Sequence, residues 1–237
     1  MPTNPFKFKQ FTIIQEKSAM KVGTDGVLLG AWTTCENAKT ILDIGTGTGL
    51  IALMLAQKSK AQITAIEIDA NAAEEAKLNV ENSPWSDRIS VYNLSIQEFA
   101  KLYPNKYDLI VSNPPYFSKS KKAENESRSL ARHNDNLSLA DLINCIDLLL
   151  NENGVFNLII TTDVIEILIS EAKKKHLFCI QKLWIKPTPE IDAKRVLVTF
   201  SRIDGECKEN TIIIETNGRH NYSEEYKNLT QDYYLKF

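Results

Sequence analysis

The sequence predicts an α/β fold, namely a seven-stranded, mostly parallel sheet with an antiparallel C-terminal strand pair and helices on both faces. Two observations predict this architecture. Short apolar runs alternate with helical segments from Thr40 to Lys175, as in parallel strands that are joined by crossover helices. After residue 175 the chain changes to strands separated by turns, which indicates antiparallel pairing at one side of the sheet.

Each element follows from a local pattern. Residues 6–15 begin with strict apolar/polar alternation and predict a half-buried strand or hairpin, and a turn at 21–26 leads into a helix from about Gly26 to Thr34. Strands are then predicted at 40–44, 62–68, 88–93, 107–112, 155–160, 177–184, 195–201 and 211–215. Helices are predicted at 50–57, 70–82, 96–102, 137–150 and 163–175. Residues 118–136 lack apolar periodicity and predict a long polar loop, of a length that is usually functional or disordered.

The length of 237 residues suits one α/β domain, and we predict a single domain over 1–237 with residues 1–34 as an N-terminal extension covering the cofactor site. A net charge of −2 argues against a uniformly basic nucleic-acid surface. Local basic stretches at 1–24, 117–133 and 172–195 fit either phosphate contacts or ordinary solvated faces.

The cysteines and the apolar runs bear on the compartment. The four cysteines are scattered without a Cys-x-x-Cys pair and predict reduced thiols rather than a zinc site or a disulfide framework: Cys35, Cys145, Cys179 and Cys207. No apolar run approaches the roughly 20 residues of a membrane span, and the N-terminus lacks the apolar core of a secretory signal. We therefore expect a cytoplasmic protein with no membrane association.

A glycine loop follows the strand at 40–44. Its pattern is Asp43-x-Gly45-x-Gly47-x-Gly49, placed between a strand and a helix, where open α/β sheets bind their ligands. The third glycine arrives one residue earlier than in the dinucleotide fingerprint Gly-x-Gly-x-x-Gly. An acidic residue before the loop suits a ligand with a cationic amine and no phosphate, such as the methionine half of S-adenosylmethionine. The alternative is a plain strand–helix turn.

Two further strand ends extend this ligand site. Glu67 ends the second strand about 20 residues after the glycine loop, where a carboxylate can accept both hydroxyls of a ribose. Its neighbour Asp69 is a better candidate for the cap of the next helix. Ser95 follows the third strand, where the adenine of a nucleoside would lie.

The strand at 107–112 ends in Asn113-Pro114-Pro115-Tyr116, a stiff segment because each proline restricts the residue before it. This segment offers an amide oxygen, a backbone carbonyl and an aromatic ring to one planar group that carries an NH2. Hydrogen bonds from that NH2 to the Asn113 side chain and the Pro114 carbonyl would direct the nitrogen lone pair toward a sulfonium methyl group. Tyr116 would stack on the ring of a base swung out of its helix. The alternative is a proline-rich turn that only ends a strand.

These motifs make the chain resemble the class I S-adenosylmethionine-dependent methyltransferases, with a Rossmann-like fold, that act on exocyclic or amide nitrogens. Three further segments resemble a narrower group, the bacterial tRNA1(Val) (adenine(37)-N6)-methyltransferase family: Met20–Trp32, Ala131-Arg132-His133, and Asn221–Tyr226 with Leu229-Thr230-Gln231. The resemblance covers essentially the whole chain. It implies methyl transfer to an adenine beside the anticodon of a valine tRNA, with S-adenosylhomocysteine as product, no metal and no obligate protein partner.

The resemblance also implies roles for individual residues. The residues expected to bind the cofactor are Thr24, Asp43, Gly45, Thr46, Gly47, Gly49, Glu67, Ile68, Ser95 and Ile96. The residues expected to act in catalysis are Asn113, Pro114, Pro115 and Tyr116. The residues expected to contact RNA are Lys119, Lys121, Lys122, Arg128, Arg132 and His133. Ser95 departs from the pattern of related enzymes, which often have an aspartate there, whereas Thr24 is expected at the methionine end of the cofactor.

Other functions share part of this pattern. A protein glutamine amide suits the Asn-Pro-Pro-Tyr segment equally well, and so does an amino group of a base in DNA or ribosomal RNA. A nicotinamide dehydrogenase is disfavoured by the glycine spacing, and an inactive cofactor-binding module is disfavoured by the intact Asn113–Tyr116 segment. The basic stretches favour a nucleic acid over a protein as the methyl acceptor.

Overall fold

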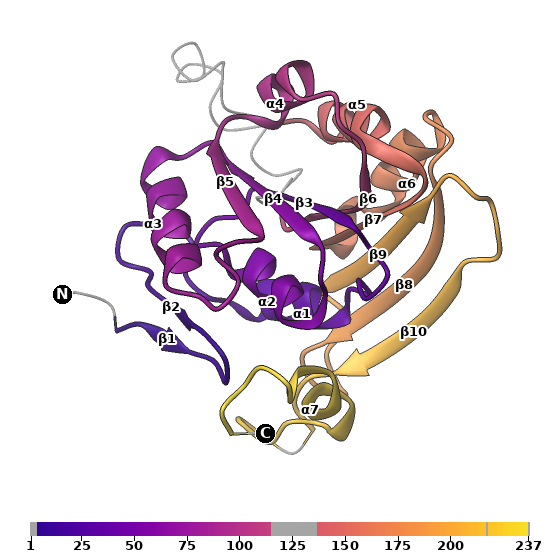
Figure 1. The fold of residues 1–237 in the computed structure, drawn as a ribbon. Helices are drawn as coiled ribbons and strands as arrows, with labels where there is room; N and C mark the ends of the chain where they lie inside the picture. Colours follow the sequence, from indigo (N-terminus) through magenta and orange to yellow (C-terminus); the bar gives the residue numbers. More distant parts are fainter. Residues whose placement is uncertain (1–3, 115–136, 217, 237) are drawn as a thin grey trace, which may run out of the picture.

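A computed structural model describes residues 4–114, 137–216 and 218–236 (Figure 1). Within these residues the main sheet has eight strands in the order β10-β8-β9-β7-β6-β3-β4-β5. Their bounds are β3 (Thr40–Ile44), β4 (Gln62–Glu67), β5 (Ile89–Asn93), β6 (Tyr107–Ser112), β7 (Leu150–Thr161), β8 (Phe178–Lys186), β9 (Arg195–Ser201) and β10 (Lys208–Ile213). A separate hairpin near the N-terminus pairs β1 (Phe6–Lys7) with β2 (Thr12–Ile13), as the alternating pattern at 6–15 predicts.

Strand direction in the main sheet is nearly uniform. Only β9 opposes its neighbours β7 and β8 in the described chain, whereas β10 lies parallel to β8 at the edge. The predicted fold class of a mostly parallel sheet with antiparallel pairing near its C-terminal end is therefore confirmed. The predicted number of seven strands is too low, because β10 extends the sheet beyond β8. The carboxyl ends of all strands except β9 consequently lie along one edge, which we call the carboxyl edge.

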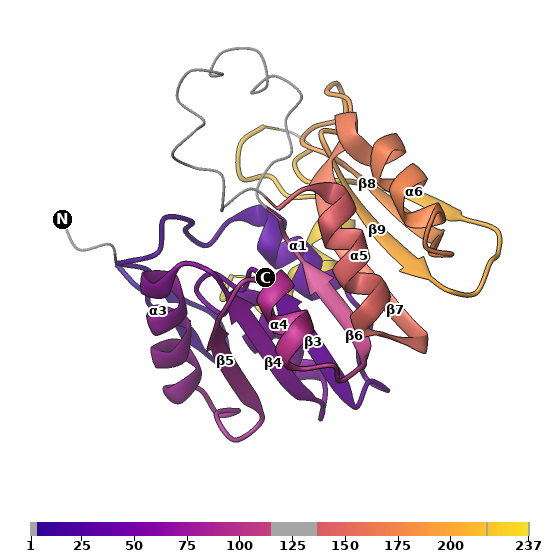
Figure 2. The ribbon, with the colours of Figure 1, turned by 90° about the horizontal axis from the view of Figure 1, so that it is seen from above.

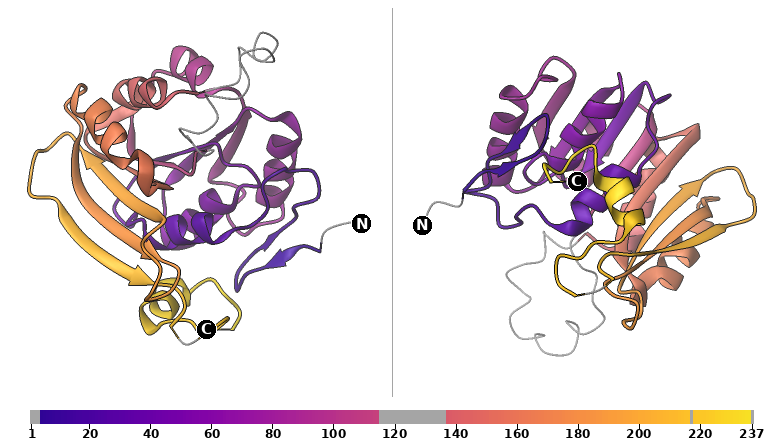
Figure 3. Two further views of the ribbon diagram at one scale, coloured as in Figure 1. Left: turned by 180° about the vertical axis from the view of Figure 1, so that it is seen from behind. Right: turned by 90° about the horizontal axis from the view of Figure 1, so that it is seen from below.

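Two helical layers cover the sheet (Figures 2 and 3). One layer contains α1 (Thr24–Trp32), α2 (Leu50–Lys58), α3 (Ala70–Glu81) and, against α1 and β10, α7 (Glu224–Thr230). The other contains α4 (Ile96–Leu102), α5 (Leu139–Leu149) and α6 (Ile165–Lys173), which follows a short 3-10 turn, η3 (Thr162–Val164). Each layer closes its own hydrophobic core against one face of the sheet. No helix in the described part of the chain is long and apolar enough to cross a membrane.

Side-chain caps fix the first turns of several helices. Asp69 accepts a hydrogen bond from the Ala72 N–H at the start of α3, as its position before the helix predicts. Ser138 caps α5 in the same way. Because these caps satisfy otherwise unpaired N–H groups, the helices begin close to the residues expected from the sequence.

Several elements differ from the sequence prediction. Residues 151–154 lie between the predicted helix at 137–150 and the predicted strand at 155–160, but they belong to β7, whose first residue Leu150 pairs with Tyr107 of β6 before a shift of register. Helix α7 was not predicted. The scattered cysteines are all free thiols in the described chain, yet two of them meet, with 3.3 Å between the Sγ atoms of Cys179 and Cys207.

The two ends of the chain meet beside α1 and α2. The Lys9 N–H donates to the Tyr233 carbonyl at 2.9 Å, and the Lys9 ammonium donates to the Gln231 carbonyl at 2.6 Å. The Tyr233 hydroxyl donates to the Met54 carbonyl of α2 at 3.1 Å. These bonds hold the N-terminal hairpin and the C-terminal tail together on one side of the molecule (Figure 3).

Candidate active site

Four adjacent strands end at one level of the carboxyl edge. Ser112 at the end of β6 pairs with Ile44 at the end of β3, so the next residues, Asn113 and Gly45, lie side by side. Glu67 ends β4 at the same level and pairs with Asn93 of β5. Since neighbouring strands lie about 4.8 Å apart, the row from Asn113 to Asn93 spans roughly 14 Å. The separately predicted motifs therefore meet in one elongated site.

The glycine loop needs glycine for its backbone conformation. Gly45, Gly47 and Gly49 have φ values of +69°, +57° and +85°, in the left-handed region that side chains disfavour. A Cβ atom built on Gly45 or Gly47 would meet no described atom within 4 Å. The loop therefore leaves open space above its backbone, as expected where a ligand approaches the main chain closely.

Asp43 stabilises this loop from below. Its side chain is fully buried, and Oδ2 accepts hydrogen bonds from the Thr46 hydroxyl at 2.6 Å and the Ala52 N–H at 3.2 Å. Its Oδ1 has no partner among the described atoms. Burial raises the pKa of Asp43 to about 7, with the two hydrogen bonds opposing the rise and the nearby Glu67 charge adding to it. A cationic ligand above the loop would favour the ionised carboxylate.

Glu67 is half-buried and connects the loop to the next strand. Its Oε2 accepts a hydrogen bond from the Gly47 N–H at 2.8 Å, and its Oε1 accepts one from the Asp69 N–H at 3.0 Å. Asn93 was not predicted as a site residue, although it ends a parallel strand, which is the same signal that identifies Glu67. Its amide donates to the Glu67 and Ile68 carbonyls at 2.8 and 3.0 Å and fixes the turn after β4.

The predicted adenine end of the site is less fully preformed. Ser95 caps α4 in a capping box, in which its hydroxyl donates to Glu98 Oε2 at 2.7 Å and accepts from the Glu98 N–H at 3.2 Å. One lone pair of the Ser95 hydroxyl remains for a ligand. The Ile68 side chain is 55% exposed at this edge and offers an apolar surface, whereas the Ile96 side chain is buried in the core. Any contact of Ile96 with a ligand would therefore use its backbone.

At the other end of the row, a hydrogen bond positions Asn113. The Ser112 hydroxyl donates to the Ile44 carbonyl at 3.0 Å and holds the ends of β6 and β3 together. Asn113 is half-buried and Pro114 is buried. The other predicted catalytic and RNA-contacting positions lie outside the described residues: Pro115, Tyr116, Lys119, Lys121, Lys122, Arg128, Arg132 and His133.

Thr24 begins α1 and is exposed. Two residues later, Gly26 packs against Leu50, which begins α2 directly after the glycine loop; a Cβ on Gly26 would lie 3.0 Å from Leu50 Cδ2. Asp25 pairs with Arg195 at the start of β9, with 2.8 Å between Oδ2 and Nε. The first turn of α1 therefore lies at the carboxyl edge, and the contact of Thr24 with the cofactor stays a prediction.

Two side chains of α3 that the sequence did not single out hold the segment preceding α1. The buried Glu75 carboxylate accepts hydrogen bonds from the N–H groups of Glu16, Lys17 and Ser18, at 2.5, 2.8 and 2.9 Å. Asn79 accepts from the Ile14 N–H, and its amide donates to the carbonyls of Ile14 and of Thr48 in the glycine loop. The Asn79 side chain therefore forms hydrogen bonds with both the N-terminal segment and the glycine loop.

The donor set fits S-adenosylmethionine. The open backbone of the glycine loop accommodates a close ligand, the Glu67 carboxylate lies at the same level, and Asp43 supplies a buried oxygen without a partner. The exposed face of Ile68 suits a flat ring. The described residues contain no cluster of His, Cys, Asp or Glu suited to hold a metal ion.

Solved structures of methyltransferases share this fold. A predicted O-methyltransferase from Agrobacterium tumefaciens matches with a TM-score of 0.72 and 20% identity over 88% of this chain and 96% of that one. A ribosomal protein L11 methylase from Lactobacillus delbrueckii subsp. bulgaricus matches with a TM-score of 0.56 and 16% identity, over 84% of this chain and 100% of that one. At these identities the likeness concerns the fold, and it confirms the predicted fold class.

Sequence comparison identifies the family. The model of the methyltransferase small domain matches residues 18–137. Relatives from Flavobacterium psychrophilum and Bacteroides fragilis are 49% and 48% identical, each over 98% of this chain and over 99% and 98% of the relative. A relative from Trichodesmium erythraeum is 47% identical over the full length of both chains. All three are named tRNA1(Val) (adenine(37)-N6)-methyltransferase. The chain therefore belongs to this family of S-adenosylmethionine-dependent methyltransferases, as its motifs predict.

Proposed function

We propose that the protein transfers the methyl group of S-adenosylmethionine to the exocyclic amino group of the adenine beside the anticodon of a valine tRNA. The observation that carries this proposal is the match over almost the whole chain to relatives that bear this activity in their names. The proposal includes tRNA as the partner, action in the cytoplasm and no requirement for a membrane or a second protein.

The chemistry requires little from the protein beyond positioning. S-adenosylmethionine supplies an electrophilic methyl group when it is bound. The Asn113 side-chain oxygen and the Pro114 carbonyl accept the two hydrogens of the adenine amino group, so that the nitrogen lone pair is directed away from the base ring and toward the methyl group. The register of β6 and β3 supports this role, because it places Asn113 next to the glycine loop. Tyr116 is the predicted ring that stacks on the flipped base.

The principal alternative is methylation of a protein glutamine, for which Asn113 and Pro114 offer the same two acceptors. Methylation of a DNA or ribosomal RNA base is a further alternative. The family favours a tRNA acceptor over these three. The acceptor is therefore the part of the proposal that requires a direct test.

The test uses total tRNA from a strain that lacks the enzyme, together with labelled S-adenosylmethionine. We expect label in valine tRNA, and mass spectrometry should locate N6-methyladenosine beside the anticodon. No label in valine tRNA, or label at another position of the tRNA, would contradict the proposal. Asn113→Ala should abolish single-turnover transfer and leave the cofactor affinity within about threefold, because the amide contacts the acceptor only. Lost binding with retained transfer would reject the role of Asn113.

A further inference from the structure

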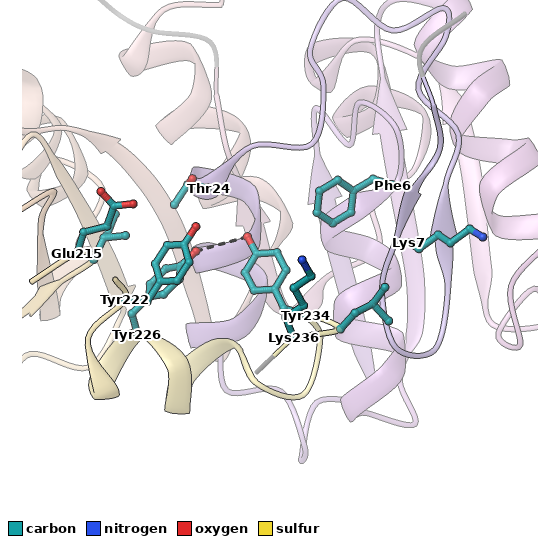
Figure 4. Close-up of a pocket in the computed structure, with 10 residues that line it drawn as sticks. Phe6, Lys7, Thr24, Glu215, Tyr222, Tyr226, Tyr234 and Lys236 are labelled. Atoms are coloured by element: carbon teal, nitrogen blue, oxygen red, sulfur yellow. Dashed lines mark hydrogen bonds between the residues drawn. The ribbon is translucent and has the colours of Figure 1, made fainter. Parts of the chain in front are cut away.

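A cavity separate from the row of strand ends opens beside α1, where the two ends of the chain meet (Figure 4). Its volume is about 460 Å³, and aromatic and basic side chains of both ends line it. The aromatic residues are Phe6, Tyr222, Tyr226 and Tyr234. All four lie outside the segment that matches the methyltransferase small domain, residues 18–137. The aromatic lining of the cavity is therefore built by parts of the chain that the general methyltransferase domain does not include.

The aromatic side chains form a continuous wall. Tyr222 and Tyr226 stack with ring centroids 5.3 Å apart and an interplanar angle of 25°. The Tyr226 and Tyr234 hydroxyls lie 3.4 Å apart, and Phe6 lies 6.3 Å from the Tyr234 ring. Tyr226 is buried, whereas the other three rings are half-exposed. The wall thus presents ring surface on which a planar group can stack.

Positive charge lies beside this wall. Lys236 lines the cavity next to Tyr234 and is exposed, whereas the ammonium group of Lys7 points away from the tyrosines (Figure 4). Lys236 has no ion-pair partner among the described side chains. A neighbouring cavity of about 690 Å³ shares Tyr222 and Lys236 with the first and adds His220 and Lys227. Aromatic rings with adjoining ammonium groups are the combination that binds a base together with its phosphate.

The loop that carries Tyr222 has a defined conformation. Glu215 Oε1 accepts a hydrogen bond from the His220 N–H at 2.8 Å, and His220 has a φ of +68°. The His220 ring nitrogen lies 3.3 Å from the Tyr222 hydroxyl. Tyr222 is therefore preorganised, which lowers the entropy cost of binding. The Glu215 carboxylate in the same cavity disfavours a bare anion as the occupant.

The cavity adjoins the methyl-transfer site. Thr24 lines the cavity, and the first turn of α1 packs on Leu50 directly after the glycine loop. Ile214 and Glu215 line the cavity too, and they follow β10 at the carboxyl edge. An RNA whose target base enters the site beside Asn113 therefore passes close to this cavity.

We infer that the cavity between Tyr222, Tyr234 and Lys236 binds a second unpaired nucleotide of the RNA that carries the target adenine. Its base stacks on the tyrosine wall, and its phosphate lies at Lys236. This inference rests on the proposed function, because it requires an RNA substrate. An unpaired nucleotide suits the cavity because its base is free to stack, as in other recognition of loops and single strands.

The inference is tested by measuring the affinity for a valine tRNA transcript by fluorescence anisotropy in the presence of S-adenosylhomocysteine. Tyr222→Ala should weaken tRNA affinity by about 5- to 150-fold, the range of one lost base stack. Tyr222→Phe keeps the ring, so its tRNA affinity should stay within about twofold of that of the wild-type protein. The affinity for S-adenosylhomocysteine should be unchanged in both variants, which also verifies that they are folded.

A charge-matched pair of variants provides an independent measurement. Lys236→Ala should reduce the slope of log affinity against log salt by about 0.7, the value for one phosphate of a single strand. Lys77→Ala removes the same charge from an exposed position on α3 and should leave the slope unchanged. Equal slopes in the two lysine variants, or equal affinities of Tyr222→Ala and Tyr222→Phe, would overturn the inference. If the wild-type protein methylates valine tRNA in the same preparation, failure of the inference leaves the proposed function intact. If the wild-type protein methylates no tRNA, the proposed function itself is overturned, and the inference with it.

Discussion

The carboxylate of Glu75 is expected to hold the whole N-terminal segment against α3. Its side chain is buried, and it accepts three backbone hydrogen bonds from consecutive residues, 16 to 18. Hydrogen bonds to a charged group contribute roughly 1.5–3 kcal/mol each before the released groups are hydrated. In Glu75→Ala the amides of residues 16 and 17 regain water, so we expect a net loss of about 2–4 kcal/mol in the free energy of unfolding.

The preceding residue provides the matched control. Glu74 pairs with Lys17 of the same segment at 3.0 Å, but both side chains are well exposed, at 66% and 58%. Exposed ion pairs contribute about 0–1 kcal/mol, so Glu74→Ala should change stability very little. Glu75→Gln keeps the shape and one acceptor oxygen, but its NH2 group faces N–H donors. Its loss of stability should therefore lie between those of Glu74→Ala and Glu75→Ala.

Urea unfolding and amide hydrogen exchange measure the two aspects of this prediction. The unfolding midpoint should fall in the order Glu74→Ala, Glu75→Gln, Glu75→Ala. The amides of residues 16–18 should lose protection in Glu75→Ala while those of β3 and β6 keep theirs. Equal midpoints for Glu74→Ala and Glu75→Ala would show that the three hydrogen bonds do not anchor the segment.

Three further predictions concern the glycine loop and its surroundings. Glu67→Ala should weaken S-adenosylmethionine binding in calorimetry by roughly 10- to 100-fold, because the Gly47 N–H loses its acceptor together with the predicted ribose contact, and unchanged affinity would exclude both roles. The raised pKa of Asp43, about 7, means that the folded protein binds a proton more tightly than the unfolded chain, so the free energy of unfolding should decline as pH rises from about 4 to about 7. The decline attributable to Asp43 is at most roughly 4 kcal/mol, and Asp43→Asn should remove it; parallel pH profiles of the two proteins would contradict the raised pKa. Gly30→Ala should lower stability by about 1–3 kcal/mol, since its Cβ would lie 2.6 Å from Met54 Sδ, whereas Gly205→Ala, with open space around the position, should be neutral within about 0.5 kcal/mol in the same urea titration.

The sequence predicts the elements from Thr40 to Ser112 to within two residues, because each has a complete local pattern. Five-residue apolar strands end in polar or glycine positions, and caps such as Asp69 mark the helix starts. That the glycine loop, Glu67 and Asn113 meet at one edge was predictable too, because parallel strands bring their carboxyl ends together whatever their exact register. Residues 151–154 were not predicted as strand because they are polar residues and a glycine, and in the structure they form an irregularity of β7 between the pairs Leu150–Tyr107 and Val155–Leu109.

The anchoring contacts were not predictable in this way. In the sequence, Glu75 is one of several glutamates on a helix, and its three partners lie 57 to 59 residues away. Helix α7 has only 7 residues, too few for a clear period, and is held by the Ser223 cap and by packing on α1 and β10. Such contacts depend on how distant segments are placed, and a single sequence carries no signal for that placement.

The division of the chain suggests where acceptor selection lies. The glycine loop, Glu67 and Asn113 all belong to residues 18–137, the stretch shared with the methyltransferase small domain, and they are the residues predicted to contact the cofactor and the methyl acceptor. The N-terminal hairpin and the C-terminal tail lie outside that stretch, yet they are joined through Lys9 to Gln231 and Tyr233. Because the hairpin packs on the tail, a change at either end alters the same cavity. Substitutions there should therefore change the affinity for RNA with little effect on the affinity for the cofactor, whereas substitutions in the glycine loop should do the reverse.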